Sequence, residues 1–111
     1  MKSITIDQIK LMKEWRHRIH SNPELGFEEQ MTSQFVIQCL ISWGYKVTTG
    51  LAETGVVGQK VFGDGSGPKI GLRADMDALP MTEENDFSYK SKFKLKSYFS
   101  FFANENIFLY L

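Results

Sequence analysis

The stretch LISWGYKVTT, residues 40–49, changes from helical to strand spacing around a single glycine. The apolar residues up to this glycine recur at the spacing of one helical face, which predicts a helix over about residues 28–43. That face holds Phe35, Val36, Cys39, Leu40 and Trp43. Gly44 stands where a helix commonly ends in a left-handed residue. Residues 45–49 then alternate and are rich in β-branched side chains, so a strand is predicted directly after the helix.

An amphipathic helix is also predicted N-terminal to this stretch, over residues 7–20. Its apolar residues recur every three to four positions and form one stripe. They are Ile9, Met12, Trp15 and Ile19. Asp7 is expected to cap the helix, because its carboxylate can accept from the free N–H groups of the first turn. Asn22-Pro23 is expected to end it, because proline disfavours helical geometry in the preceding residue.

Two further strands are predicted C-terminal to the stretch, over residues 54–62 and 69–75. They are separated by the glycine-dense loop 63–68, and so short a connection favours antiparallel pairing. The predicted fold class is therefore α/β, with two N-terminal helices followed by an incomplete mixed β-sheet. Such a sheet leaves an open strand edge, which invites self-association or pairing with another chain.

The composition is that of a soluble globular chain, with 42% apolar and 23% charged residues. Thirteen basic and thirteen acidic side chains cancel, which speaks against nucleic acid as a partner. A membrane partner is not expected either, because no stretch approaches the ~18 apolar residues of a membrane span. The single cysteine excludes an internal disulfide and fits a reducing interior, so a cytoplasmic location is expected.

Three blocks of sequence resemble one enzyme family in the same order. They are WRHRIHSNPELGFEE at 15–29, GYKV through TGVVG at 44–58, and GLRADMDALP with TEEN at 71–85. Over about residues 7–92 the chain resembles the M20 peptidase family of metal-dependent amidohydrolases. This group includes hippurate hydrolase, N-acyl amino acid amidohydrolases and auxin-conjugate hydrolases. The resemblance implies that the two helices and the sheet are the start of an M20-type catalytic domain.

The resemblance also implies a reaction. Full-length relatives hydrolyse the amide bond of an N-acyl amino acid substrate and use two divalent ions, zinc or manganese, to activate a water. A segment with cysteine and histidine normally follows the third block and begins the set of metal ligands. Here the sequence leaves the family pattern at about Phe93, no histidine lies beyond His20, and the one cysteine, Cys39, precedes the site. We therefore expect no metal ligands and no bound cofactor in this chain.

This departure divides the chain into two parts. Residues 1–92 are interpreted as a truncated N-terminal part of an M20-like catalytic domain. Residues 93–111 are interpreted as a divergent, aromatic-rich tail from outside the family, with a genuine C-terminal strand or helix as the alternative. Three hypotheses for function follow: an amidohydrolase remnant that is inactive alone, a split-enzyme subunit completed by a second chain, or a small non-catalytic binding module.

Asp75 is the candidate catalytic residue, and it is a candidate by resemblance. It lies at the end of the third predicted strand, and the resemblance implies that it orients a metal ligand and does not bind ions itself. The competing interpretation is a loop carboxylate that closes a turn. Asp77 has a weaker claim to the same role. Arg73 has only hydrogen-bond donors and cannot coordinate a cation, so a salt bridge with Asp75 or Asp77 is expected.

His17 and His20 lie three residues apart on one predicted helix. Without a third ligand at a fitting spacing, they are expected to be helix-end histidines that hydrogen-bond to the backbone, and not a metal site. The resemblance places His20, Pro23 and Glu24 in a structural turn beside the site. Cys39 lies on an apolar helical face and is expected to be a buried small hydrophobe, not a nucleophile.

Overall fold

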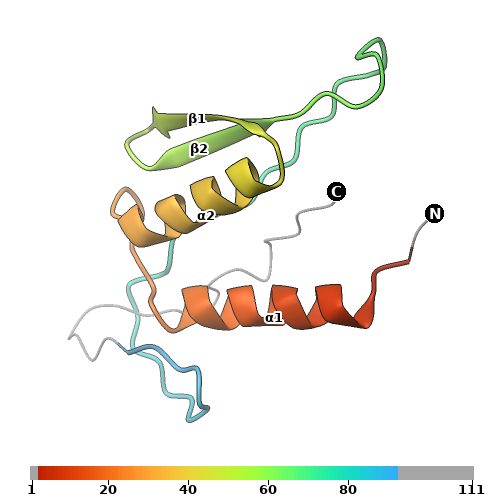
Figure 1. Cartoon of the computed structure of the whole chain (residues 1–111). Coiled ribbons are helices and arrows are strands. Elements are labelled where there is room, and N and C mark those ends of the chain that lie inside the picture. The colour runs from red at the N-terminus through yellow and green to blue at the C-terminus, as the bar shows by residue number, and fades with distance from the viewer. Residues whose placement is uncertain (1–2, 93–111) are drawn as a thin grey trace.

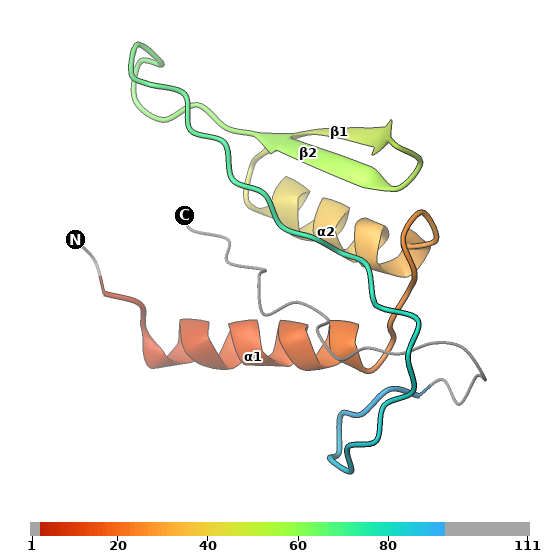
Figure 2. The ribbon, with the colours of Figure 1, turned by 180° about the vertical axis from the view of Figure 1, so that it is seen from behind.

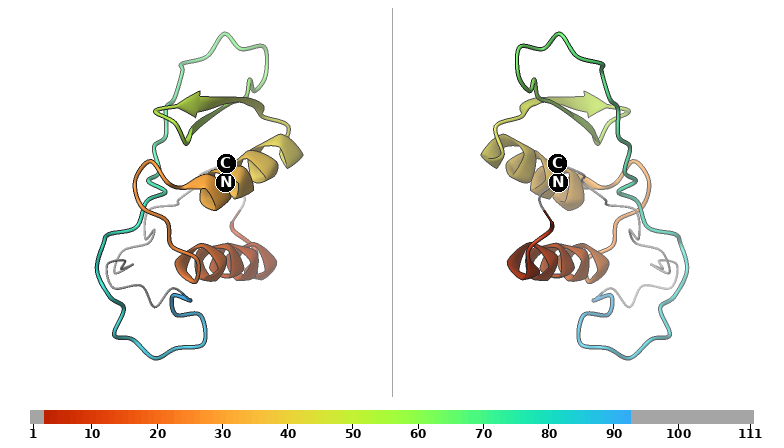
Figure 3. Two further views of the ribbon diagram at one scale, coloured as in Figure 1. Left: turned by 90° about the vertical axis from the view of Figure 1, so that its left-hand side faces the viewer. Right: turned by 90° about the vertical axis from the view of Figure 1, so that its right-hand side faces the viewer.

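The computed structural model describes residues 3–92 of the chain. Its elements are α1 (Ile6–His20), α2 (Gln30–Ser42), β1 (Lys46–Leu51) and β2 (Gly55–Gln59). The elements stack in three layers, with α2 between α1 and the two-stranded sheet (Figures 1 and 3). This architecture confirms the predicted α/β class and the order of two helices followed by an incomplete sheet. The predicted tail at 93–111 lies outside the described residues.

Helix α1 begins with a capping box formed by Thr5 and Gln8. The Thr5 hydroxyl accepts from the Gln8 amide at 3.2 Å, and the Gln8 side chain accepts from the Thr5 amide at 2.8 Å. The prediction that Asp7 caps this helix is therefore wrong, because the box already serves two free N–H groups of the first turn. Asp7 lies inside that turn, where negative charge favours the helix dipole. The helix ends at His20, before Asn22-Pro23, as predicted.

Helix α2 receives its N-terminal cap from a residue well upstream. Glu29 occupies the cap position but makes no side-chain capping bond. The Glu24 carboxylate accepts instead from the amides of Met31 and Thr32, at 2.9 and 2.7 Å, and from the Thr32 hydroxyl at 2.7 Å. The turn after α1 thus fixes where α2 begins. At the other end Gly44 has a φ of 76°, which confirms the predicted left-handed residue.

Strands β1 and β2 form an antiparallel hairpin that packs on α2. Val47 pairs with Gly58 and Thr49 with Val56. A Cβ added at Gly58 would stand 3.1 Å from the Leu40 methyl groups, so the glycine lets α2 approach the sheet closely. Two bonds pin the hairpin turn to the start of α2. Ser33 donates to the Thr54 carbonyl at 2.7 Å, and the Thr54 hydroxyl donates to the Glu29 carboxylate at 2.6 Å.

The predicted third strand over residues 69–75 is not formed. Within residues 3–92, no backbone hydrogen bond reaches residues 69–75. They run from the glycine loop past the hairpin and α2 (Figure 2). The antiparallel pair predicted across the glycine loop is therefore wrong. Strand β2 pairs with β1 across a shorter turn at 52–54, which costs less loop-closure entropy.

Buried side chains in the described part of the chain are mostly polar. Ile19, Leu40 and Ala78 are the buried apolar residues, while His20, Ser21, Glu29, Thr32, Ser33 and Thr54 are buried as well. Such groups must be hydrogen-bonded to be tolerated, and the bonds to Thr54 and Thr32 show how this is achieved. In residues 3–92, no helix is both long enough and apolar enough to cross a membrane.

Candidate functional site

Asp75, the candidate catalytic residue, lies on the surface in an ion pair with Arg73. The Arg73 guanidinium donates to the Asp75 carboxylate at 2.5 Å, and both side chains are exposed. This confirms the expected salt bridge and identifies its partner as Asp75. An exposed pair of this kind is screened by water and contributes little to stability. Within residues 3–92, Asp75 is not placed next to a histidine or cysteine by any hydrogen bond or ion pair.

Asp77 lies beside the turn that follows α1. A Cβ added at Gly26 would lie 3.7 Å from the Asp77 Oδ2 atom. The next residue, Ala78, donates its amide to the Glu24 carbonyl at 2.7 Å, and Leu25 and Ala78 form an isolated parallel bridge. The first and third sequence blocks therefore meet directly, although some fifty residues separate them along the chain.

A second contact between these blocks joins His20 to Glu83. The His20 Nε2 atom lies 2.8 Å from Glu83 Oε1, and the side chains are only 10% and 4% exposed. The Ser91 amide donates to the other carboxylate oxygen at 2.7 Å. Burial raises the pKa of Glu83, but the bonds from Ser91 and His20 outweigh it, so the pKa lies below its ordinary value. Glu83 is thus a buried carboxylate that folds the segment 83–92 against the end of α1.

The other histidine, His17, is held by an aromatic side chain of the same segment. Its ring stacks on Tyr89 with centroids 3.6 Å apart and planes 7° from parallel. Phe87 stacks on Tyr89 in turn. The pKa of His17 is lowered by desolvation and then by the charges of Arg16, Lys13 and His20, which favours the neutral ring.

We call His17, His20, Glu83, Phe87 and Tyr89 the clasp. In it the two histidines each contact a side chain of the segment 83–92, where hydrogen bonds to the backbone were expected. The sequence reasoning did not single out Glu83 or Tyr89. The available signal was that Glu83 lies inside the third sequence block, directly after the candidate aspartates.

Cys39 lies on α2 and is half-buried, not fully buried as expected. Burial raises the pKa of its thiol, and the Arg18 charge only partly opposes this. The thiol form is therefore favoured, which fits the expected packing role and not that of a nucleophile.

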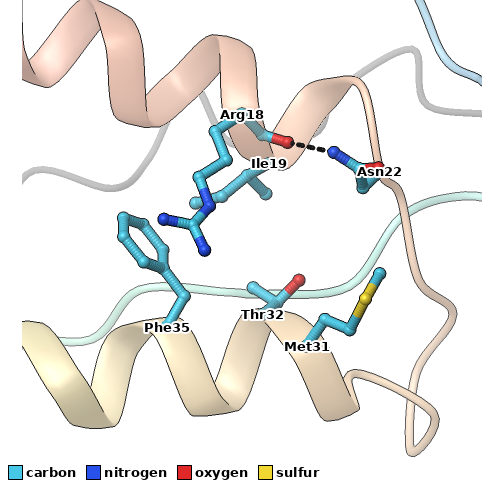
Figure 4. A pocket seen from close by; sticks show the side chains of 6 residues that line it. All are labelled: Arg18, Ile19, Asn22, Met31, Thr32 and Phe35. Atoms are coloured by element: carbon cyan, nitrogen blue, oxygen red, sulfur yellow. Dashed lines mark hydrogen bonds between the residues drawn. The ribbon is translucent and has the colours of Figure 1, made fainter.

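An open pocket lies between α1 and α2 (Figure 4). Its lining residues are Arg18, Ile19, Asn22, Met31, Thr32 and Phe35. The Arg18 guanidinium lies 4.2 Å from the Phe35 ring centroid and makes a cation–π contact with one face of the ring. Asn22 donates to the Arg18 carbonyl at 2.9 Å. The lining offers neither a carboxylate nor an imidazole for acid–base catalysis.

Comparison with known proteins shows which enzymes this chain resembles in sequence. No protein-family model matches the chain. Curated proteins do match it. The chain is 54% identical over 77 residues to hippurate hydrolase of Campylobacter jejuni, covering 69% of this chain and 20% of that enzyme. It is 40% identical over 88 residues to an N-acyl-L-amino acid amidohydrolase of Geobacillus stearothermophilus, covering 78% and 24%.

A plant enzyme extends the same set. An IAA-amino acid hydrolase of Arabidopsis thaliana is 48% identical over 77 residues, with 69% of this chain and 17% of the enzyme covered. These matches support the interpretation of residues 1–92 as a fragment similar to M20-type amidohydrolases. The chain spans about a fifth of the length of these curated relatives.

The metal pair expected in M20-type enzymes needs several nitrogen, sulfur or carboxylate ligands that converge on one point. Among residues 3–92, no group of three or more His, Cys, Asp and Glu side chains is placed to hold a metal ion. Across the whole sequence the histidines are His17 and His20, and both belong to the clasp. The described residues therefore do not fit a two-metal centre of the M20 type.

Proposed function

We propose that this chain is a structural segment of an N-acyl amino acid amidohydrolase and that it does not hydrolyse amides on its own. The proposed reaction of the complete enzyme is hydrolysis of the amide bond to a carboxylate and a free amino acid. Support for this substrate class comes from the names of the relatives, which act on hippurate, N-acyl-L-amino acids and IAA-amino acids. The chain has one cysteine and so cannot form an internal disulfide, which supports a cytoplasmic location.

The observation that carries the proposal is the use of both histidines in the clasp. A histidine that coordinates a metal must present a free ring nitrogen to the ion. His20 directs Nε2 at the buried Glu83 carboxylate, and His17 has its Nε2 atom 3.0 Å from the Arg16 guanidinium while its ring stacks flat on Tyr89. We propose that the metal ligands of the complete enzyme lie outside residues 3–92, because those residues place no group of three or more His, Cys, Asp and Glu side chains where it could hold an ion.

The chain's own contribution is to bring the first and third blocks together. The Glu24 carboxylate caps α2, the Glu24 carbonyl accepts from Ala78, and His20 contacts Glu83. These contacts set where Asp75 and Asp77 emerge relative to the helices. We propose that Asp75 acquires its orienting role only when a second polypeptide segment provides the metal ligands.

The test is hydrolysis of a panel of N-acyl amino acids, including hippurate, by the purified chain with zinc or manganese. Metal content is measured on the same sample, and the Campylobacter jejuni hippurate hydrolase is the positive control. We expect no turnover and no stoichiometric metal. Turnover with about two ions bound per chain would contradict the proposal.

A second arm separates a split-enzyme subunit from an inactive remnant. The chain is co-expressed with a version of the Campylobacter jejuni enzyme that lacks the matched 77 residues. Restored hippurate hydrolysis identifies a subunit completed by another chain. A poorly soluble chain that restores no activity favours the inactive remnant. A cooperatively folding monomer that restores no activity favours the small binding module.

A further inference from the structure

The segment 69–75 combines an exposed apolar face with a backbone that makes no hydrogen bond to the rest of residues 3–92. Ile70 is 83% exposed and Leu72 is 63% exposed, and they alternate with the polar or small residues Lys69, Gly71 and Arg73. Ala74 continues the apolar face and Asp75 the polar one. Residues with strand alternation and free backbone N–H and C=O groups are a template for pairing with another strand.

The charges of the segment are placed so that two antiparallel copies of it carry opposite charges facing each other. In an antiparallel pair of two copies centred on Leu72, Lys69 of one copy stands opposite Asp75 of the other. The two-fold axis repeats this pair on the far side, and it places Ile70 opposite Ala74. One face of the ribbon is then wholly apolar, and the other carries two pairs of opposite charge.

The present partner of Asp75 does not prevent this pairing. Arg73 reaches Asp75 along the same strand face in an exposed ion pair, which costs little to rearrange. In the symmetric pair Arg73 stands opposite Gly71, which leaves room for the long side chain.

We propose that residues 69–75 are a self-association strand, through which two copies of this chain pair antiparallel about Leu72. The partner that this surface fits is a second copy of the same chain. A two-stranded ribbon is only marginally stable, so the dimer is expected to be weak and to depend on protein concentration. This inference goes beyond the proposed amidohydrolase role, since it concerns two copies of this chain alone.

Crosslinking tests the register directly. Directly opposite residues of an antiparallel pair have Cα atoms about 4.5–5.5 Å apart, which suits a disulfide. In a Cys39→Ser background, Leu72→Cys is expected to form a covalent dimer under mild oxidation, faster than Ile6→Cys. Ile6 is the matched control because it is as exposed as Ile70 and lies on α1.

Charge reversal supplies the second readout. Sedimentation of the full chain is followed over about a hundredfold range of concentration, from its 12.8 kDa monomer mass upward. Lys69→Glu and Asp75→Lys are each expected to weaken dimerisation about tenfold, because each reverses two charge pairs. The double variant Lys69→Glu/Asp75→Lys is expected to restore it.

Any of three results would overturn the proposal. One is crosslinking of Leu72→Cys no faster than that of Ile6→Cys. Another is a double charge variant that associates no better than the single ones. A chain that stays monomeric but binds the Campylobacter jejuni enzyme lacking its matched residues also overturns it, and assigns the surface to that different polypeptide. None of these results bears on whether the chain alone hydrolyses amides.

Discussion

Residues 46–59 and residues 69–75 both carry strand-like sequence, yet only the first region forms a sheet. The hairpin strands lie next to each other in sequence and are covered on one face by α2. The second region has equally regular alternation, but Ile70 and Leu72 remain exposed. The difference shows that alternation becomes a strand only when a neighbour supplies hydrogen bonds and a layer covers the apolar face.

The largest expected effect comes from removing the cover of the hairpin. Leu40 is buried between α2 and β2, so Leu40→Ala should lower the free energy of unfolding by about 2–5 kcal/mol. The matched change Ile70→Ala in the exposed segment should alter it by less than about 0.5 kcal/mol. Urea unfolding followed by circular dichroism measures both. Equal losses of stability in Leu40→Ala and Ile70→Ala would mean that the two side chains are equally buried.

The second largest loss in the free energy of unfolding is expected from a change in the clasp, because the clasp holds residues 83–92 against α1. Glu83→Gln removes a buried carboxylate that accepts from His20 and Ser91, so we expect a loss of about 1.5–3 kcal/mol. Urea unfolding at neutral pH measures it. Asp86→Asn is the control, since Asp86 lies nearby in an exposed pair with Lys90. A loss in the control as large as in Glu83→Gln would contradict this ranking.

The same carboxylate predicts a pH dependence. The folded-state pKa of Glu83 lies below its ordinary value of 4.5. Its stabilisation is therefore fully present above that value and is lost as the pH falls through the lower folded-state pKa. Unfolding curves between neutral pH and the acid limit should show this loss in the wild-type chain and a smaller one in Glu83→Gln. Parallel profiles for the two chains would assign the acid loss to other carboxylates.

A smaller effect is expected from adding a single methyl group to each region. Gly58→Ala places a Cβ 3.1 Å from the Leu40 methyl groups, so a loss of about 1–2 kcal/mol is expected. Gly71→Ala meets nothing within 4 Å and should be neutral or slightly stabilising. Thermal unfolding of the two variants measures the change in stability that each methyl group causes. A destabilising Gly71→Ala would reveal a neighbour that presses on the exposed segment.

The smallest effect is expected for the ion pair next to the candidate catalytic residue. Arg73→Ala should leave the unfolding midpoint of the dilute chain unchanged, because Arg73 and Asp75 are both exposed. A clear shift of the midpoint would show that Asp75 is held more firmly than its exposure indicates.

Local spacing was enough to predict the two helices, the left-handed Gly44 and the first strands. Each of these depends on residues a few positions apart, where helical periodicity, turn chemistry and β-branching act directly. The cap of α1 was misassigned within the same window. Asp7 is a good capping residue by type, but Thr5 and Gln8 together satisfy two N–H groups.

The candidate site was predicted less completely. The exposed Arg73–Asp75 pair follows from two residues on one face of an extended segment, and the sequence indicated it. The contact of His20 with Glu83 and the stacking of His17 on Tyr89 join residues more than sixty positions apart. Spacing along the chain carries no information about such pairs, because they form only when the end of α1 and the segment 83–92 are folded together.

The sequence by itself therefore determined the α/β class, the helices and the similarity to M20-type amidohydrolases. The tertiary structure decided which strands pair, that Glu24 caps α2, and that both histidines serve the clasp. The physical reason is the range of the interactions. Periodicity and caps are local, whereas strand pairing and buried polar contacts depend on neighbours brought close by the fold.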